Sequence, residues 1–122
     1  MPDGRHVLVF RHPLAGTQLV KGTVEPGEAL KVAALRELAE ESGLSGTVLD
    51  QPRWSAMDIA EGQIWHFLLI SVSAIPERFR FHTADDGGHV FSFFWWPLHD
   101  EPDSEWHDIF IRALHQIRAH LN

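Results

Sequence analysis

The chain has 122 residues, a formal net charge of −7 and no cysteine, and hydrophobic residues make up 44% of it. This length predicts a single domain, residues 1–122, with a real apolar core. The absence of cysteine excludes a disulfide scaffold and cysteine-based zinc sites. The acidic balance argues against a general surface for nucleic acid, although metal ions would still let a small phosphorylated ligand bind. Since the sequence shows neither a bilayer-spanning apolar stretch nor a signal sequence, we expect no membrane contact and a cytoplasmic location.

The predicted elements alternate between strands and helices, without repeats or low-complexity tracts. The clearest strand is a near-continuous apolar run, QIWHFLLISVS, which we expect to be buried. Prolines interrupt one pair of strands at Pro52 and end the last strand at Pro97. The predicted strands are His6–His12, Gln18–Lys21, Gly46–Leu49, Arg53–Met57, Gln63–Ser73 and Val90–Trp96; the predicted helices run from about Ala29 to Ser42, and from a cap at Asp103 or Ser104 to about Leu121.

The first predicted helix carries acidic side chains where helix electrostatics disfavour them. The helix ends at Gly43, and Glu37, Glu40 and Glu41 crowd its last two turns. The carbonyl end of the helix dipole repels negative charge there, by roughly 0.3–1 kcal/mol per exposed group. Glu37 and Glu41 are also four residues apart, on the apolar stripe of the helix rather than opposite it. We therefore expect a cation to complete this face, and a divalent metal is the simplest candidate.

The spacing of these glutamates resembles a known family signature. Residues 22–44 read GTVEPGEALKVAALRELAEESGL, which resembles the motif of the Nudix hydrolases at every fixed position. The motif constrains positions along both a loop and a helix, so it is far more specific than a short glycine-rich motif. Outside these residues the resemblance extends only to the order of strands and helices.

The resemblance implies an α/β fold, a Nudix-type α/β/α sandwich with a mixed β-sheet between helices. Family members usually carry another strand before the equivalent of His6–His12, and only five residues precede that strand here. We therefore expect the sheet to lack its usual first strand, unless a partner chain or a different start site supplies one.

The resemblance also implies roles for the glutamates. Glu37 and Glu41 would be the main ligands of Mg²⁺, for which Mn²⁺ can substitute, with Glu40 assisting through one ion or a bridging water. Gly22 would offer its backbone carbonyl. Such a site neutralises charge on pyrophosphate oxygens and activates a water near neutral pH. The alternative is an ordinary solvated run of charges.

Two more charged residues of the motif would support this site. Arg36 would hold the glutamates through charge-assisted hydrogen bonds. Glu28 lies near the favourable end of the helix dipole, so capping the helix and steadying the loop would explain it. A contact with Arg36 or with the metal, which the resemblance implies, explains Glu28 equally well.

The sequence leaves the general base open. In some relatives a glutamate of the motif takes the proton of the water, and in others an acidic residue on a loop before a late strand does so. The corresponding loop here offers Asp85, Asp86 and His89, and histidine has a suitable pKa for proton transfer near pH 7. Because Asp-Asp-Gly-Gly is also ordinary turn sequence, a plain turn is the competing interpretation.

Substrate-binding candidates are fewer. Lys21 precedes Gly22 as in the lysine-glycine variant of the loop, which is frequent among relatives that hydrolyse dinucleoside polyphosphates. Lys21 would then contact a phosphate of the substrate. The competing interpretation is a surface lysine beside a turn. Alternation puts Trp95 and Trp96 on opposite faces of their strand, so only one of them is expected to face a ligand. The aromatic candidates for stacking on a base are Trp54, Trp65, Phe94, Trp95 and Trp96, of which we select Trp96.

We therefore predict a Mg²⁺-dependent pyrophosphohydrolase that acts on a nucleoside di- or triphosphate derivative or a dinucleoside polyphosphate. One alternative is a catalytically silent Nudix-fold protein that binds nucleotides or regulates, and another is an α/β domain whose acidic face makes protein contacts. The expected partner is a small phosphorylated substrate, a nucleotide, with neither a nucleic acid duplex nor a membrane. The sequence leaves open whether the protein forms a homodimer.

Overall fold

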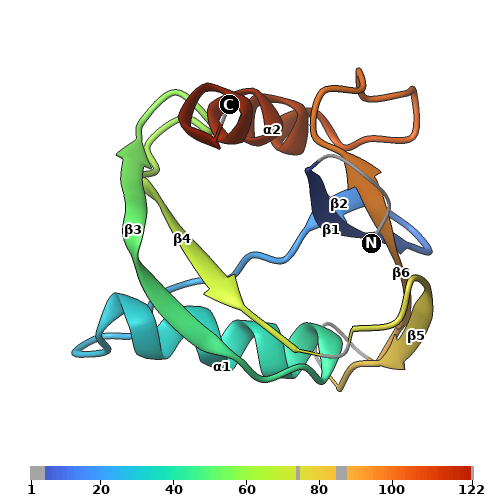
Figure 1. Ribbon diagram of the computed structural model, residues 1–122, viewed down its shortest axis with the longest axis horizontal. Helices are drawn as coiled ribbons and strands as arrows, with labels where there is room; N and C mark the ends of the chain where they lie inside the picture. Colours follow the sequence, from blue (N-terminus) through green and yellow to red (C-terminus); the bar gives the residue numbers. More distant parts are fainter. Residues whose placement is uncertain (1–4, 74, 85–87, 122) are drawn as a thin grey trace.

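The strands form two separate sheets that face each other, and the two helices lie on opposite sides of the space between them (Figure 1). This computed structural model describes residues 5–73, 75–84 and 88–121. The elements in chain order are β1 (His6–His12), β2 (Gly16–Leu19), α1 (Leu30–Ser42), β3 (Thr47–Ala56), β4 (Trp65–Ser71), β5 (Phe79–His82), β6 (Val90–Pro97) and α2 (Asp108–Leu121). The predicted α/β architecture is confirmed.

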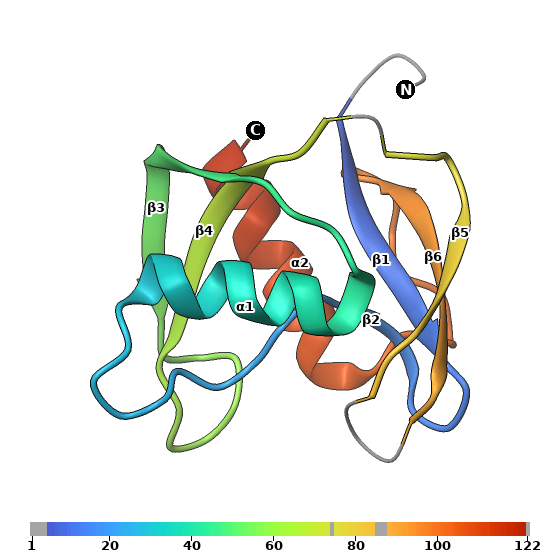
Figure 2. The same ribbon diagram turned by 90° about the horizontal axis from the view of Figure 1, so that it is seen from below.

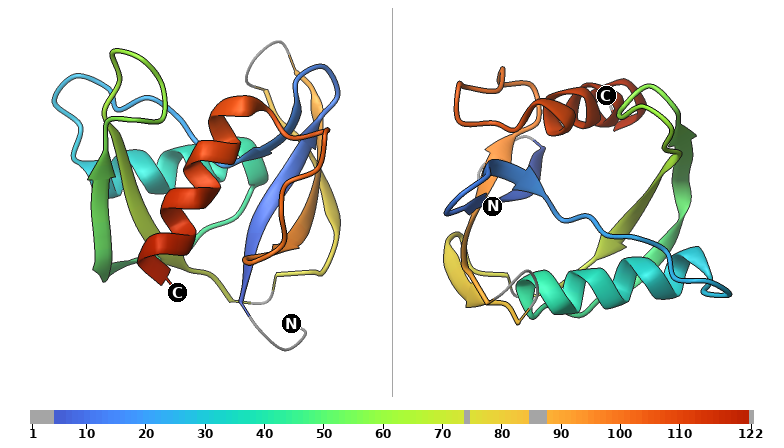
Figure 3. Two further views of the ribbon diagram at one scale, coloured as in Figure 1. Left: turned by 90° about the horizontal axis from the view of Figure 1, so that it is seen from above. Right: turned by 180° about the vertical axis from the view of Figure 1, so that it is seen from behind.

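The larger sheet has the strand order β2-β1-β6-β5, and β3 pairs with β4 in the smaller one. All strand pairs of the described residues are antiparallel, and a single parallel bridge joins Thr17 to Trp106. The single mixed sheet that we predicted is therefore wrong in detail. The two sheets are connected through helices and loops, and Figure 3 shows the same arrangement from above and from behind.

Several predicted elements need correction. Strand β3 runs through Pro52 without a break, and its pairing with β4 shifts register between Val48 and Arg53; the Gln51–Pro52 peptide is cis. Strand β5 was not predicted, and β2 begins and ends two residues earlier than expected. The apolar run of β4 is half-buried rather than buried, because one of its edges faces a cavity.

Helix α2 begins at Asp108, later than the predicted cap at Asp103 or Ser104. The carboxylate of Asp103 instead accepts a hydrogen bond from the backbone N–H of Glu105 (3.0 Å), closing a turn that sends Trp106 into the core. Helix α2 has 14 residues, and within the described ranges no helix is long and apolar enough to cross a membrane.

The core consists of two clusters. One joins α2 to both sheets through Val9, Ala56, Phe110 and Leu114, and the other is a set of stacked phenylalanines around Phe10 on the larger sheet. The clusters leave a cavity of about 1030 Å³ between the two sheets.

The edges of two strands line this cavity. Consecutive residues of β4, 65–70, and of the start of β1, 6–8, border it, although successive side chains of a strand point to opposite faces. The cavity therefore meets each strand along its edge. On the other edge β1 pairs with β6 over residues 6–11, whereas β2 covers β1 only from Val9 onward.

Candidate active site

The loop between β2 and α1 leads directly into the helix (Figure 2). Two hydrogen bonds between Glu25 and Glu28 close this loop before the helix begins. The carboxylate of Glu28 accepts a hydrogen bond from the N–H of Glu25 (2.9 Å), and the N–H of Glu28 donates to the carbonyl of Glu25 (3.0 Å). Glu28 does not cap the helix, because the cap residue is Ala29, without a side-chain hydrogen bond. At the other end Gly43 adopts the left-handed conformation (φ 74°) and terminates α1 as predicted.

The guanidinium of Arg36 gathers the carboxylates of the motif. Its Nε and Nη2 donate to the two oxygens of Glu28 (2.8 and 2.9 Å), and Nη2 also donates to the carbonyl of Thr23 (2.9 Å). Its Nη1 donates to Glu37 (2.8 Å) and Glu40 (3.2 Å). Every N–H of the guanidinium is thus used. The hydrogen bonds that we predicted from Arg36 to the glutamates are present, including the contact with Glu28.

These contacts shift pKa values in the direction that keeps the charges. Hydrogen bonds from Arg36, and then the backbone N–H of Glu25, lower the pKa of Glu28 to about 2. Hydrogen bonds to Glu28 and Glu37 raise the pKa of Arg36 above its usual value. The side chain of Glu37 is only 15% exposed, whereas that of Glu40 is 41% exposed, so Glu40 is the more accessible to solvent.

Two carboxylates of α1 meet the backbone of the preceding loop at the same place. The N–H of Lys21 donates to Glu41 (3.0 Å). The carboxylate of Glu37 lies so close to Gly22 that a Cβ at this position would be 1.7 Å from its Cδ. A side chain at position 22 would therefore displace the carboxylate of Glu37 or the loop. The segment Lys21–Gly22 brings together two glutamates that lie a turn apart on the helix.

This arrangement suits an oxygen-preferring divalent cation such as Mg²⁺ or Mn²⁺, because the carboxylates of Glu37 and Glu41 converge beside an exposed backbone segment. In the described part of the chain, no three acidic or histidine side chains form a ready-made metal cluster. The reason is visible in the hydrogen bonds: Arg36 supplies the positive charge for Glu37 and Glu40 in this structure.

A loop distant in sequence is fastened to the end of α1. The hydroxyl of Thr83, which is fully buried, donates to the carbonyl of Glu40 (2.7 Å). The N–H of Thr83 also donates to the carbonyl of His89 (3.0 Å), which closes the base of this loop. Thr83, at the start of this loop, is therefore attached to the end of α1 that carries the glutamates.

The three predicted base candidates differ in what the structure says of them. Asp85 and Asp86 lie outside the described residues. The ring of His89 lies 4.9 Å from the ring of His12 on β1, centroid to centroid, and it does not border the cavity next to Glu37.

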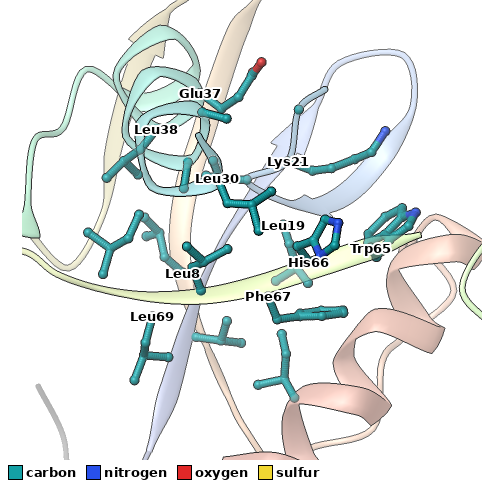
Figure 4. A pocket seen from close by; sticks show the side chains of 18 of the residues that line it. Leu8, Leu19, Lys21, Leu30, Glu37, Leu38, Trp65, His66, Phe67 and Leu69 are labelled. Atoms are coloured by element: carbon teal, nitrogen blue, oxygen red, sulfur yellow. The ribbon is translucent and has the colours of Figure 1, made fainter. Parts of the chain in front are cut away.

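The substrate-binding candidates differ in whether they border the cavity. Lys21 and Trp65 both line the cavity, with the ammonium of Lys21 lying 5.3 Å from the centre of the Trp65 ring (Figure 4). The indole N–H of Trp65 donates to the side chain of Gln63 (2.8 Å). Trp96, which we selected from the sequence, instead packs against Trp106 (5.3 Å between centroids), away from this cavity.

Comparison with known proteins decides the family. The NUDIX domain matches residues 1–114. The chain belongs to the Nudix hydrolase family. It is 39% identical over 82 residues to the RNA pyrophosphohydrolases of two strains of Caulobacter vibrioides, NA1000 / CB15N and ATCC 19089 / CIP 103742 / CB 15. Each alignment covers 65% of this chain and 44% of the relative. The chain thus matches less than half of the length of these curated relatives. No solved structure matches it significantly.

Two residues outside the Nudix motif lie beside the site; sequence analysis assigned no role to Thr83, and it named Trp65 as a candidate without selecting it. Thr83 gave no signal, because a buried threonine that binds a helix carbonyl looks like any residue before a turn. Trp65 was among the aromatic candidates, and its place in β4, the strand facing the cavity, distinguishes it from Trp96. Neither position follows from the spacing of the Nudix motif.

Proposed function

We propose that this Nudix protein is a Mg²⁺-dependent pyrophosphohydrolase that cleaves a nucleoside di- or triphosphate derivative or a dinucleoside polyphosphate. One observation carries the proposal: the carboxylates of Glu37 and Glu41 converge on the backbone of Lys21 and Gly22. Acidic groups at the carbonyl end of a helix repel each other and the helix dipole, so a cation-binding role explains their position better than solvation does.

The residues of the motif would have different roles in such a reaction. Glu37 and Glu41 would hold Mg²⁺, which when bound would supply charge neutralisation for the pyrophosphate oxygens and an activated water. Hydrogen bonds from Arg36 orient the carboxylates of Glu28 and Glu37, and they lower the pKa of Glu28 so that it is an anion at neutral pH. Glu40, the more exposed carboxylate, is accessible to assist through one ion or a bridging water.

The cavity beside the glutamates supports a nucleotide as substrate. Lys21 offers a mobile positive charge to a phosphate next to Gly22. Trp65 offers an aromatic face whose centre lies 5.3 Å from the ammonium of Lys21. A phosphate near Lys21 would place the base toward Trp65, so the stacking role moves from Trp96 to Trp65. Asp85, Asp86 and His89 stay candidates for the general base.

The similarity to RNA pyrophosphohydrolases favours a second candidate, the 5′-polyphosphate end of an RNA. The same metal-binding carboxylates would serve it, since the bond broken is again a phosphoric anhydride. The two candidates differ in what lies beyond the first nucleotide of the substrate.

One experiment tests the proposal. Product release would be measured with Mg²⁺ and with chelator for nucleoside triphosphates, diadenosine polyphosphates, ADP-ribose and a 5′-triphosphorylated RNA. We expect Mg²⁺-dependent cleavage of one class, a loss of several powers of ten in rate in Glu41→Gln, and wild-type rates in the matched control Glu61→Gln, an exposed turn residue. Binding of Mg²⁺ and nucleotide without turnover of any substrate would favour the silent binding protein instead.

A further inference from the structure

The larger sheet carries a row of basic side chains on one face, apart from the active-site cavity. Arg11 of β1 and Arg80 of β5 both lie opposite Ser92 of β6, one on each side of it. Their side chains are on the same sheet face because directly paired residues point the same way. With Arg78, which precedes β5, they border a hollow of about 430 Å³.

An aromatic ring lies between these arginines. The guanidiniums of Arg11 and Arg78 approach the ring of Phe94 to 5.6 and 6.0 Å from its centroid. Phe94 is half-buried, because it also packs against the core cluster around α2. Its ring is thus held rigidly at the surface, with cationic groups around it.

The charge of this face contrasts with that of the whole chain. The chain has ten Lys and Arg residues against 17 Asp and Glu, yet three of the ten gather here. Arg11 is partly neutralised by Glu105 (3.2 Å), and both side chains are more than half exposed. Across the described residues, neither Arg78 nor Arg80 forms a salt bridge with an acidic group, so both offer their full charge to a ligand.

We propose that this face, formed by Arg11, Arg78, Arg80, Ser92 and Phe94, binds single-stranded nucleic acid. Guanidiniums pair with phosphates, and an aromatic ring on a sheet is a platform for an unstacked base. The backbones of Arg11 and Arg80 are two strand spacings apart, roughly 10 Å, so they suit successive phosphates of one chain rather than a single phosphate.

A single strand fits this face better than a duplex does. A duplex keeps its bases stacked inside, so it would use the arginines and leave Phe94 without a role. None of the residues around this hollow borders the cavity next to Glu37. The proposal therefore stands or fails independently of the pyrophosphohydrolase activity.

The test is fluorescence anisotropy with a labelled single-stranded RNA of about 12 nucleotides, within the range of sites on such surfaces. The RNA would carry a 5′-hydroxyl, which leaves no pyrophosphate for the cavity, and salt would be varied from about 50 to 200 mM. We expect Arg78→Ala and Arg80→Ala each to weaken binding about tenfold and to reduce the salt slope by about 0.7. Arg53→Ala, an exposed arginine of the other sheet, is the matched control and should bind as the wild type does.

A second variant tests the aromatic contact. Phe94→Leu keeps an apolar side chain against the core and removes the ring, so it should weaken RNA binding while leaving binding of inorganic polyphosphate unchanged. Hydrolysis of a small nucleotide should be unaffected in Arg80→Ala. No RNA binding at the lowest salt, equal loss in Arg53→Ala, or equally tight binding of a duplex of the same length would each overturn the proposal.

Discussion

Replacing Gly22 by alanine tests the central contact of the active site. The backbone of Gly22 lies outside the left-handed region, so alanine meets no conformational penalty there. Its Cβ, however, would lie 1.7 Å from the Cδ of Glu37, against at least 3.4 Å for an ordinary van der Waals contact. The carboxylate, or the loop, must therefore move by about 1.7 Å.

If Glu37 holds the metal as proposed, a displacement of this size should be costly to the reaction but not to the fold. A misplacement of about 1 Å in a catalytic site can lower the rate roughly 100-fold. We therefore expect Gly22→Ala to reduce kcat at least about 100-fold. Affinity for Mg²⁺, measured by calorimetric titration without substrate, should also weaken. The thermal unfolding temperature should change little, because Glu37 can turn toward solvent.

Gly27→Ala is the matched control for this prediction. Gly27 lies in the same loop at φ 77°, where alanine is strained, but nothing lies within 4 Å of the added Cβ. It should lower the free energy of unfolding by about 1 kcal/mol and leave kcat nearly unchanged. The opposite pattern, with wild-type turnover and Mg²⁺ affinity in Gly22→Ala, would refute the role of the contact between Gly22 and Glu37.

Three further predictions concern the surroundings of this contact. The pKa of Glu28 is lowered from 4.5 to about 2. Its pairing with Arg36 should therefore make its full contribution to the free energy of unfolding above pH 4.5, and this contribution should disappear as the pH falls toward 2. An NMR titration of the carboxyl carbon of Glu28 checks the pKa. Thr83→Val should cost about 1 kcal/mol in urea unfolding, since it removes the hydrogen bond to the Glu40 carbonyl. Lys21→Ala should raise KM several-fold with kcat nearly unchanged, whereas an equal loss in kcat would make Lys21 part of the chemistry.

The sequence predicted the active-site helix well because its signal is local. The acidic residues of α1 violate the electrostatics of an ordinary helix, and Gly43 marks its end, so both the helix and its chemistry follow from neighbouring residues. The hydrogen bonds from Arg36 to the glutamates were also expected, because the resemblance to the Nudix motif implied them.

Features that depend on tertiary contacts were less predictable. Pro52 is an ordinary strand breaker in sequence, and only the pairing of β3 with β4 shows that the strand continues through it with a register shift. The short strand β5 alternates Phe79 and Phe81 with arginines, a weak signal that the preceding Pro76 obscured. Alternation separated Trp95 from Trp96, as observed, but which strand face meets the cavity depends on packing.

The cavity between the two sheets has a consequence for the cooperativity of unfolding. Since the core is divided into two clusters, the chain buries less apolar surface than a close-packed domain of its length. The heat capacity change and the denaturant m-value on unfolding should therefore be smaller than the averages for 122 residues. Among the strands, hydrogen exchange should be fastest in the β3–β4 hairpin, which pairs with no other strand in the described part of the chain and would open before the phenylalanine-rich sheet.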